Sequence, residues 1–162
     1  MKNYFFILFF VIISCQNKTM SENQIPSFNF KTIDDKLVST DSLLGEATII
    51  CVWATWCGDC IREIPELNEL VVKYKNNDKV NFIAFSDEDE ETVRKSLKKF
   101  PFHFDHIVNS KSYSDQLKTG VVKHFPQVIV VDNNLNVVFE VTENKQKIFD
   151  TLDLHIQDII SK

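Results

Sequence analysis

The sequence predicts an α/β fold in which a mixed central sheet is flanked by helices. Short apolar runs at 47–53, 80–85 and 127–131 are rich in β-branched residues, as is typical of buried strands. Residues 58–74 carry apolar side chains at steps of three and four, which indicates an amphipathic helix. Residues 132–134 read Asp-Asn-Asn between two apolar runs and indicate a hairpin. Strands that alternate with helices and end in a hairpin favour a mixed sheet covered on both faces.

The other elements follow from the same two periodicities. We expect a hairpin at 28–30 and 37–38, followed by a helical turn at 40–45 closed by glycine. Helices are expected at 88–100 and 112–117, with a short strand at 104–108 between them. The chain should end with a hairpin strand at 137–141 and a last helix at 145–160. The acidic run at 88–91 is expected to be a solvated helix start, where carboxylates favour the helix dipole.

The amino terminus has the pattern of an export signal. A basic start precedes an apolar run at 4–13, too short for a membrane-spanning helix, which needs about 20 residues. Ser14-Cys15 closes this run and resembles the lipobox of bacterial lipoproteins, in which the cysteine is lipidated and the preceding segment is removed. We expect a removed signal at 1–14, lipidated Cys15 with a flexible tether at 15–24, and one domain at 25–162. An ordinary signal peptide or an uncleaved anchor is the alternative.

Composition narrows the function classes. The formal net charge is -5 and no basic cluster is present, which argues against nucleic acid as a partner. Besides Cys15 the chain has Cys51, Cys57 and Cys60, too few thiols for a disulfide-stapled scaffold. We expect a monomer that needs no cofactor.

Cys57 and Cys60 carry the chemistry. Their spacing places two thiols within bonding range across the first turn of the predicted helix, so the pair can cycle between dithiol and disulfide. The alternative is a site for copper or another metal that uses the same pair with His124. A structural metal site normally takes about four ligands, and the sequence has no second Cys-x-x-Cys and no paired histidine motif.

Four segments carry a resemblance that covers nearly all of residues 25–162. They are residues 25–28 (Ile-Pro-Ser-Phe), 52–57 (Val-Trp-Ala-Thr-Trp-Cys), 60–65 (Cys-Ile-Arg-Glu-Ile-Pro) and 124–126 (His-Phe-Pro). Together they resemble thioredoxin-fold proteins, and more narrowly the membrane-tethered TlpA/ResA-like thiol-disulfide oxidoreductases. The resemblance implies a thioredoxin-like fold with an amino-terminal hairpin, and a central insertion between Ser86 and Val121.

The helix start assigns roles to the pair and its neighbours. Free N–H groups and the positive dipole end favour a thiolate, so Cys57 is expected to be the exposed nucleophile and the more shielded Cys60 the resolving thiol. Trp56 is interpreted either as a core aromatic or as a lid over the disulfide that offers a partner an apolar surface. Gly58 would let another backbone approach.

Two carboxylates are expected to tune the pair. Asp59 departs from the commonest pattern of the thioredoxins that the chain resembles, in which this position is proline. Its charge would raise the Cys57 pKa and make the dithiol more reducing, unless it is merely an exposed first-turn residue. Glu63 matches a glutamate that the resemblance implicates in proton transfer, with a surface ion pair to Arg62 or Lys73 as the alternative. Cys51 replaces the acidic or amide residue of the relatives and is expected to be a buried structural thiol.

The segment 124–126 completes the predicted site. The resemblance implies that Pro126 is cis, and that Phe125 and Pro126 bind a substrate strand. Together with the lipobox, it implies a lipid-anchored enzyme outside the cytoplasm, on a bacterial inner or outer membrane. This enzyme would reduce or exchange disulfides of exported proteins, including those of apocytochromes. A membrane electron donor would recycle the pair. A metallochaperone using the same cysteines is the alternative function, whereas a peroxiredoxin-type peroxidase needs a Pro-x-x-x-Thr-x-x-Cys segment that the sequence lacks.

Overall fold

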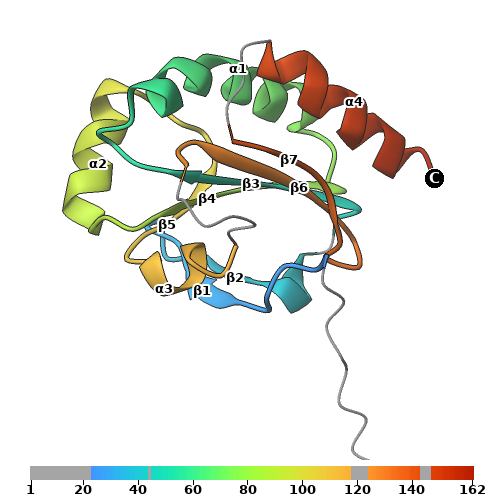
Figure 1. Cartoon of the computed structure of the whole chain (residues 1–162), viewed down its shortest axis with the longest axis horizontal. Coiled ribbons are helices and arrows are strands. Elements are labelled where there is room, and N and C mark those ends of the chain that lie inside the picture. Colours follow the sequence, from blue (N-terminus) through green and yellow to red (C-terminus); the bar gives the residue numbers. More distant parts are fainter. Residues whose placement is uncertain (1–22, 44, 118–123, 143–146) are drawn as a thin grey trace, which may run out of the picture.

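The centre of the molecule is a mixed sheet of five strands. The computed structural model describes residues 23–43, 45–117, 124–142 and 147–162. The strands are β3 (Ala47–Trp53), β4 (Val80–Ser86), β5 (Asp105–Ile107), β6 (Gln127–Asp132) and β7 (Val137–Val141). They lie in the order β5-β4-β3-β6-β7, with β4 parallel to β3 and β5, and β6 antiparallel to β3 and β7 (Figure 1). The predicted mixed sheet is therefore confirmed.

Strand β3 is buried along its whole length, as its apolar run predicts. Because successive side chains of a strand point to opposite faces, β3 contributes to two separate clusters. Cys51 and Trp53 belong to the cluster on one face of the sheet, whereas Ile50 and Val52 belong to the cluster on the other. Both faces of the sheet are thus covered.

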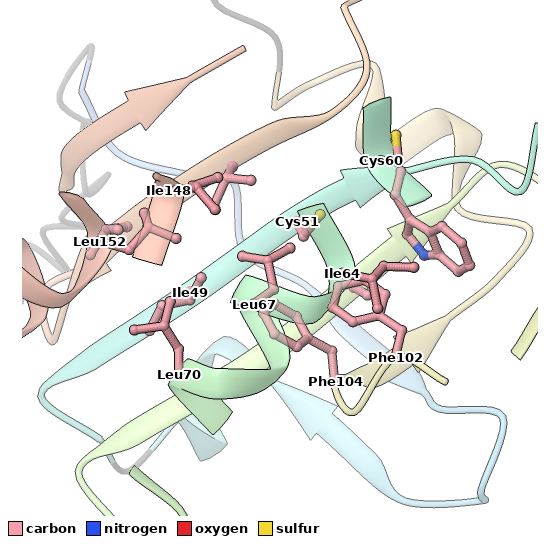
Figure 2. Packing of buried hydrophobic residues seen from close by; sticks show 14 of the residues in the cluster. Ile49, Cys51, Cys60, Ile64, Leu67, Leu70, Phe102, Phe104, Ile148 and Leu152 are labelled. Carbon is pink, nitrogen blue, oxygen red and sulfur yellow. The ribbon is translucent and has the colours of Figure 1, made fainter. Parts of the chain in front are cut away.

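Helices cover the first face. They are α1 (Gly58–Tyr74), α2 (Glu90–Lys99) and α4 (Ile148–Ile160). Helix α1 has the predicted bounds, and Figure 2 shows its Ile64 and Leu67 in the core cluster that also holds Leu152 of α4. Helix α2 begins later than predicted, because the Asp89 carboxylate caps it by accepting the Thr92 N–H at 2.8 Å. The first predicted residues of α4, at 145 and 146, lie outside the described residues.

The second face is covered by smaller elements. The hairpin of β1 (Asn29–Lys31) and β2 (Leu37–Ser39) lies over it with α3 (Lys111–Ser114), which is shorter than predicted. Aromatic rings join these elements to the sheet: the ring centroids of Phe28 and Phe85 are 5.6 Å apart, and those of Phe85 and Tyr113 are 4.9 Å apart. The central insertion therefore supplies both an edge strand, β5, and part of this cover.

Two predicted turns form, but the residues that stabilise them act differently from the prediction. The first hairpin turns without glycine because Asp35 adopts a left-handed backbone, with φ of 65°, which Asp tolerates better than most residues. The predicted helical turn is the 3-10 helix η1 (Thr40–Ser42), which ends before Gly45. Gly45 is needed for another reason: a Cβ atom there would clash with the backbone carbonyl of Lys79 at the start of β4.

The predicted tether meets the domain at its last two residues. The Asn23 carbonyl accepts the Val137 N–H at 2.8 Å, and Gln24 forms a bridge with Asn136. These two residues therefore pack on the sheet edge and are not part of a free tether. The predicted signal and Cys15 lie outside the described residues. Among the residues that are described, no helix is both long and apolar enough to cross a membrane.

Candidate functional site

Cys57 and Cys60 form a disulfide at the amino-terminal end of α1. Their Cα atoms are 5.3 Å apart, as the Cys-x-x-Cys spacing predicts. Cys57 is the N-cap residue of the helix, and its Sγ accepts the Cys60 N–H at 3.1 Å. The Cys57 N–H in turn donates to the Ala54 carbonyl at 3.1 Å, which closes the passage from β3 into α1. In the reduced protein, the Cys60 N–H and the helix dipole would favour a thiolate on Cys57.

The disulfide is less accessible than predicted. Cys57 is only 6% exposed and Cys60 3%, and both belong to the core cluster beneath α1. The expectation of an exposed Cys57 is therefore wrong for this disulfide form, because the N-capping sulfur is turned toward the helix and its partner.

Trp56 lies at the surface beside the disulfide. Its side chain is 71% exposed, so the interpretation as a core aromatic is wrong, and the core position is taken by Trp53. The Trp56 ring meets the Phe125 ring edge-on, with the centroids 5.5 Å apart. The Phe125–Pro126 peptide bond is cis, as predicted. Together Trp56 and Phe125 form an apolar surface next to the pair, which we call the aromatic ledge.

Gly58 faces open space. A Cβ atom at this position would meet nothing within 4 Å, so the fold itself does not require glycine here. The space beside the disulfide is therefore free for the backbone of another molecule. His124, adjacent to the ledge, is exposed. The described residues contain no group of three or more His, Cys, Asp or Glu side chains that could hold a metal ion.

Asp59 and Glu63 occupy different environments. Asp59 is exposed, and its carboxylate pairs with the Arg62 guanidinium at 2.5 Å. Lys73 pairs with Asp153 at 2.5 Å. The alternative interpretation of Glu63, a surface ion pair with Arg62 or Lys73, is therefore wrong, because both cations are engaged elsewhere.

Glu63 is half-buried on the flank of α1 that faces the core. Its Oε2 atom is buried and has no hydrogen-bond partner within the part of the chain that the structure describes. Burial raises the pKa of the Glu63 carboxyl to about 7, opposed by the positive charge of Arg62 and supported by the negative charges of Asp59 and Glu66. Glu63 can thus gain or lose a proton near neutral pH.

Cys51 is a free thiol in the core, 1% exposed, as predicted. Figure 2 shows it on the strand beneath α1, in the cluster that includes Cys60. Burial raises the pKa of this thiol well above its ordinary value, and the charge of Glu63 adds to the effect. Cys51 therefore stays protonated and unreactive in the folded protein.

Sequence reasoning missed Thr55 and Glu88. The acidic run that contains Glu88 was expected to be solvated, but Glu88 precedes α2 and its carboxylate binds Thr55, directly before Trp56. The signal that the sequence offers is weak: Thr55 and Glu88 each lie a short distance beyond the end of a predicted buried strand.

Comparisons with known proteins agree with this site. The chain is 26% identical over 143 residues to the thiol-disulfide oxidoreductase ResA of Bacillus cereus, covering 88% of this chain and 81% of that protein. Two solved structures share the fold. One is a thioredoxin-family thiol:disulfide interchange protein from Chlorobium tepidum (TM-score 0.69, 22% identity, 85% of this chain and 96% of that one). The other is a thiol-disulfide oxidoreductase from Bacteroides fragilis (TM-score 0.68, 17% identity, 82% and 98%).

The fold, the disulfide and these relatives define the class as a thiol-disulfide oxidoreductase of the thioredoxin fold. The model of the AhpC/TSA family matches residues 22–140, and the chain belongs to this family.

Proposed function

We propose that the protein is a lipid-anchored enzyme outside the cytoplasm that reduces or exchanges disulfides of exported proteins. The observation that carries this proposal is the Cys57–Cys60 disulfide beside the exposed aromatic ledge and the open space at Gly58. An apolar surface next to a redox pair suits a protein substrate better than a small thiol. The export signal and Cys15 in the sequence support the location.

The reaction follows from the positions of the two sulfurs. In the reduced enzyme, the Cys57 thiolate attacks one sulfur of the partner's disulfide and releases the other as a thiolate, which forms a mixed disulfide. The Cys60 thiolate then attacks Cys57 Sγ and releases the partner's second thiolate, which takes up a proton. Two electrons pass to the partner, and the enzyme is left as the disulfide. An electron donor in the membrane would return two electrons to the pair.

Glu63 is proposed to manage the protons of this exchange. Its pKa of about 7 allows the carboxylate to accept the Cys60 proton when that thiol must attack, and to return it when the pair is reduced. Phe125 and Pro126 are proposed to bind the partner as an extended strand, with Trp56 holding an apolar side chain next to its cysteine. Asp59 would adjust the potential from the exposed side of the helix.

Trapping of mixed disulfides tests the proposed function. A full-length Cys60→Ala variant cannot resolve its complexes, so exported proteins should accumulate on Cys57 as adducts that dithiothreitol releases. The matched control is the Cys57→Ala, Cys60→Ala double variant, which should trap none. Purified wild-type protein should also reduce insulin. Stoichiometric bound copper without insulin reduction would instead support the metallochaperone.

The lipid anchor has its own test. Mass spectrometry of the protein from membranes should show a chain that begins at an acylated Cys15, and a Cys15→Ala variant should be released from the membrane. An intact Met1 or a free Cys15 thiol in the mature protein would exclude the anchor, without affecting the redox proposal.

A further inference from the structure

Strand register brings Thr55 and Glu88 together beside the redox pair. Strands β3 and β4 are parallel, and their last paired residues are Trp53 and Ser86. Thr55 and Glu88 each follow their strand end by the same interval, so the two connections leave the sheet edge side by side. The Glu88 carboxylate accepts the Thr55 N–H through Oε2 and the Thr55 hydroxyl through Oε1, both at 2.7 Å. Hydrogen bonds to a charged acceptor at this distance are among the stronger ones in proteins.

Glu88 is itself held in place. The Ser86 hydroxyl donates to Glu88 Oε2 at 3.3 Å and accepts the Glu88 N–H at 3.2 Å. On its other side, the Asn109 N–H donates to the Glu88 carbonyl at 2.9 Å. Ser86 is buried at the end of β4, so the carboxylate extends from a fixed part of the sheet. Thr55 is therefore linked through Glu88 to the buried end of β4.

The contact between Glu88 and Thr55 lies next to Trp56 in the chain. Thr55 directly precedes Trp56, whose indole is largely exposed and meets the Phe125 ring at its edge. Little packing surrounds the indole, so its direction depends on the backbone that carries it. We propose that Glu88 is a positioning residue for partner docking, which holds the aromatic ledge in its binding geometry through Thr55. This inference rests on the docking role proposed above for Trp56.

The carboxylate accepts both Thr55 bonds with charged oxygens. In Glu88→Gln the amide oxygen can still accept the Thr55 N–H, but the NH₂ group can only donate to the Thr55 hydroxyl, so both bonds lose their charged acceptor while size and shape are kept. Thr55→Val removes the hydroxyl and keeps the backbone bond. The two variants thus weaken the same contact from opposite sides. Glu91→Gln, an exposed change of the same charge within α2, is the matched control.

The experiment compares a protein disulfide with a small one. With dye-labelled insulin as substrate and dithiothreitol as electron source, Glu88→Gln and Thr55→Val should each raise KM about five- to tenfold, the size expected when the contact is weakened by about one net hydrogen bond. The second-order rate constant of the reduced enzyme with dipyridyl disulfide, which is too small to need the ledge, should stay within about twofold of wild type. Glu91→Gln should match wild type in both assays.

A second cycle separates this inference from the proposal beneath it. Trp56→Ala should raise KM for insulin, and adding Glu88→Gln to that variant should raise it no further, because the residue being positioned is gone. If Trp56→Ala leaves KM unchanged, the docking role itself fails. If Trp56→Ala raises KM but Glu88→Gln does not, only the positioning role is overturned. Equal slowing of Glu88→Gln with insulin and with dipyridyl disulfide also overturns it, since the carboxylate would then act on Cys57.

Discussion

The two faces of α1 show how one helix serves structure and chemistry at once. Its inner face carries Cys60 and Leu67, buried against the sheet, and, on the flank, the half-buried Glu63. Its outer face carries Asp59 and Arg62, which are exposed and neutralise each other. Both carboxylates lie within a turn of the disulfide, but they differ in solvent exposure, and burial raises the pKa of the Glu63 carboxyl to about 7.

The difference teaches that solvent access, more than distance along the chain, decides which carboxylate can take part in thiol chemistry. Asp59 is adjacent to Cys60 in sequence, but water and Arg62 screen its charge. Glu63 is further along the helix, but burial disfavours its charged form and raises its pKa toward the pH at which thiols exchange protons. Each of the following experiments alters one face and leaves the other intact.

The largest effect is expected from the core of the inner face. Leu67 is 1% exposed, so Leu67→Ala should lower the free energy of unfolding by about 3 kcal/mol, through lost burial and a residual cavity. Val72 of the same helix is 58% exposed, and Val72→Ala should change it by less than about 0.5 kcal/mol. Urea unfolding followed by circular dichroism measures both. Similar losses for the two variants would contradict the assignment of the faces.

The next effect is a pH dependence due to Glu63. Its pKa is raised in the folded state, so protonated Glu63 supports folding at low pH, and this support is lost as pH rises from 4.5 through about 7. Gln cannot ionise, so Glu63→Gln should gain stability relative to wild type as pH rises. Because Glu63 is only half-buried, solvent screening limits the gain between about pH 5 and about pH 8 to roughly 1 kcal/mol.

Urea unfolding at both pH values measures this gain, and Glu69→Gln, an exposed change on the same helix, is the matched control. The rate of alkylation of the reduced pair tests the catalytic part separately. Its pH profile should lose the inflection near neutral pH in Glu63→Gln. A profile identical to that of wild type would show that Glu63 is not involved in proton transfer.

Local patterns predicted most of the fold. The bounds of α1 agree with its amphipathic spacing, and the apolar run of β3 correctly indicated a strand buried on both faces. Local patterns placed Trp53 in a buried strand but left Trp56 open between core and lid, because its exposure depends on what packs around it in the folded chain. The Cys57–Cys60 disulfide followed from the spacing of the two cysteines, and the cis bond before Pro126 followed from the family resemblance.

The parts of the site that escaped prediction depend on contacts between distant segments. Glu88 meets Thr55 only because β3 and β4 pair in one particular register. Glu63 lacks an ion pair because Arg62 turns toward Asp59 while Asp153 of α4 engages Lys73. Helix spacing alone favours Asp59, three residues away, over the adjacent Glu63 as the partner of Arg62, whereas the contact between Lys73 and Asp153 depends on the tertiary structure.

A smaller effect is expected on the pKa of Glu63 when a charge on the outer face of α1 is removed. Arg62 lowers the pKa of Glu63 and Asp59 raises it, so Arg62→Ala should move that pKa up and Asp59→Asn should move it down. Both groups are exposed, so each shift should be less than about half a pH unit and should shrink in high salt. An NMR titration of the Glu63 carboxyl carbon measures them. Shifts in the same direction would show that the variants act through a structural change.

The smallest effect is expected on the redox potential of the pair. Removing the Asp59 charge favours the thiolate and hence the dithiol form, so Asp59→Asn should make the potential less negative. The ion pair with Arg62 already offsets most of this charge, so the change should be below about 10 mV. Equilibration with glutathione buffers, read by alkylation, measures it in wild type, Asp59→Asn and Asp59→Pro. A wild-type potential near that of strong periplasmic oxidants would contradict the predicted reducing character. A large positive change in Asp59→Asn would mean that the outer carboxylate, despite its exposure, acts on the thiols as strongly as an inner one.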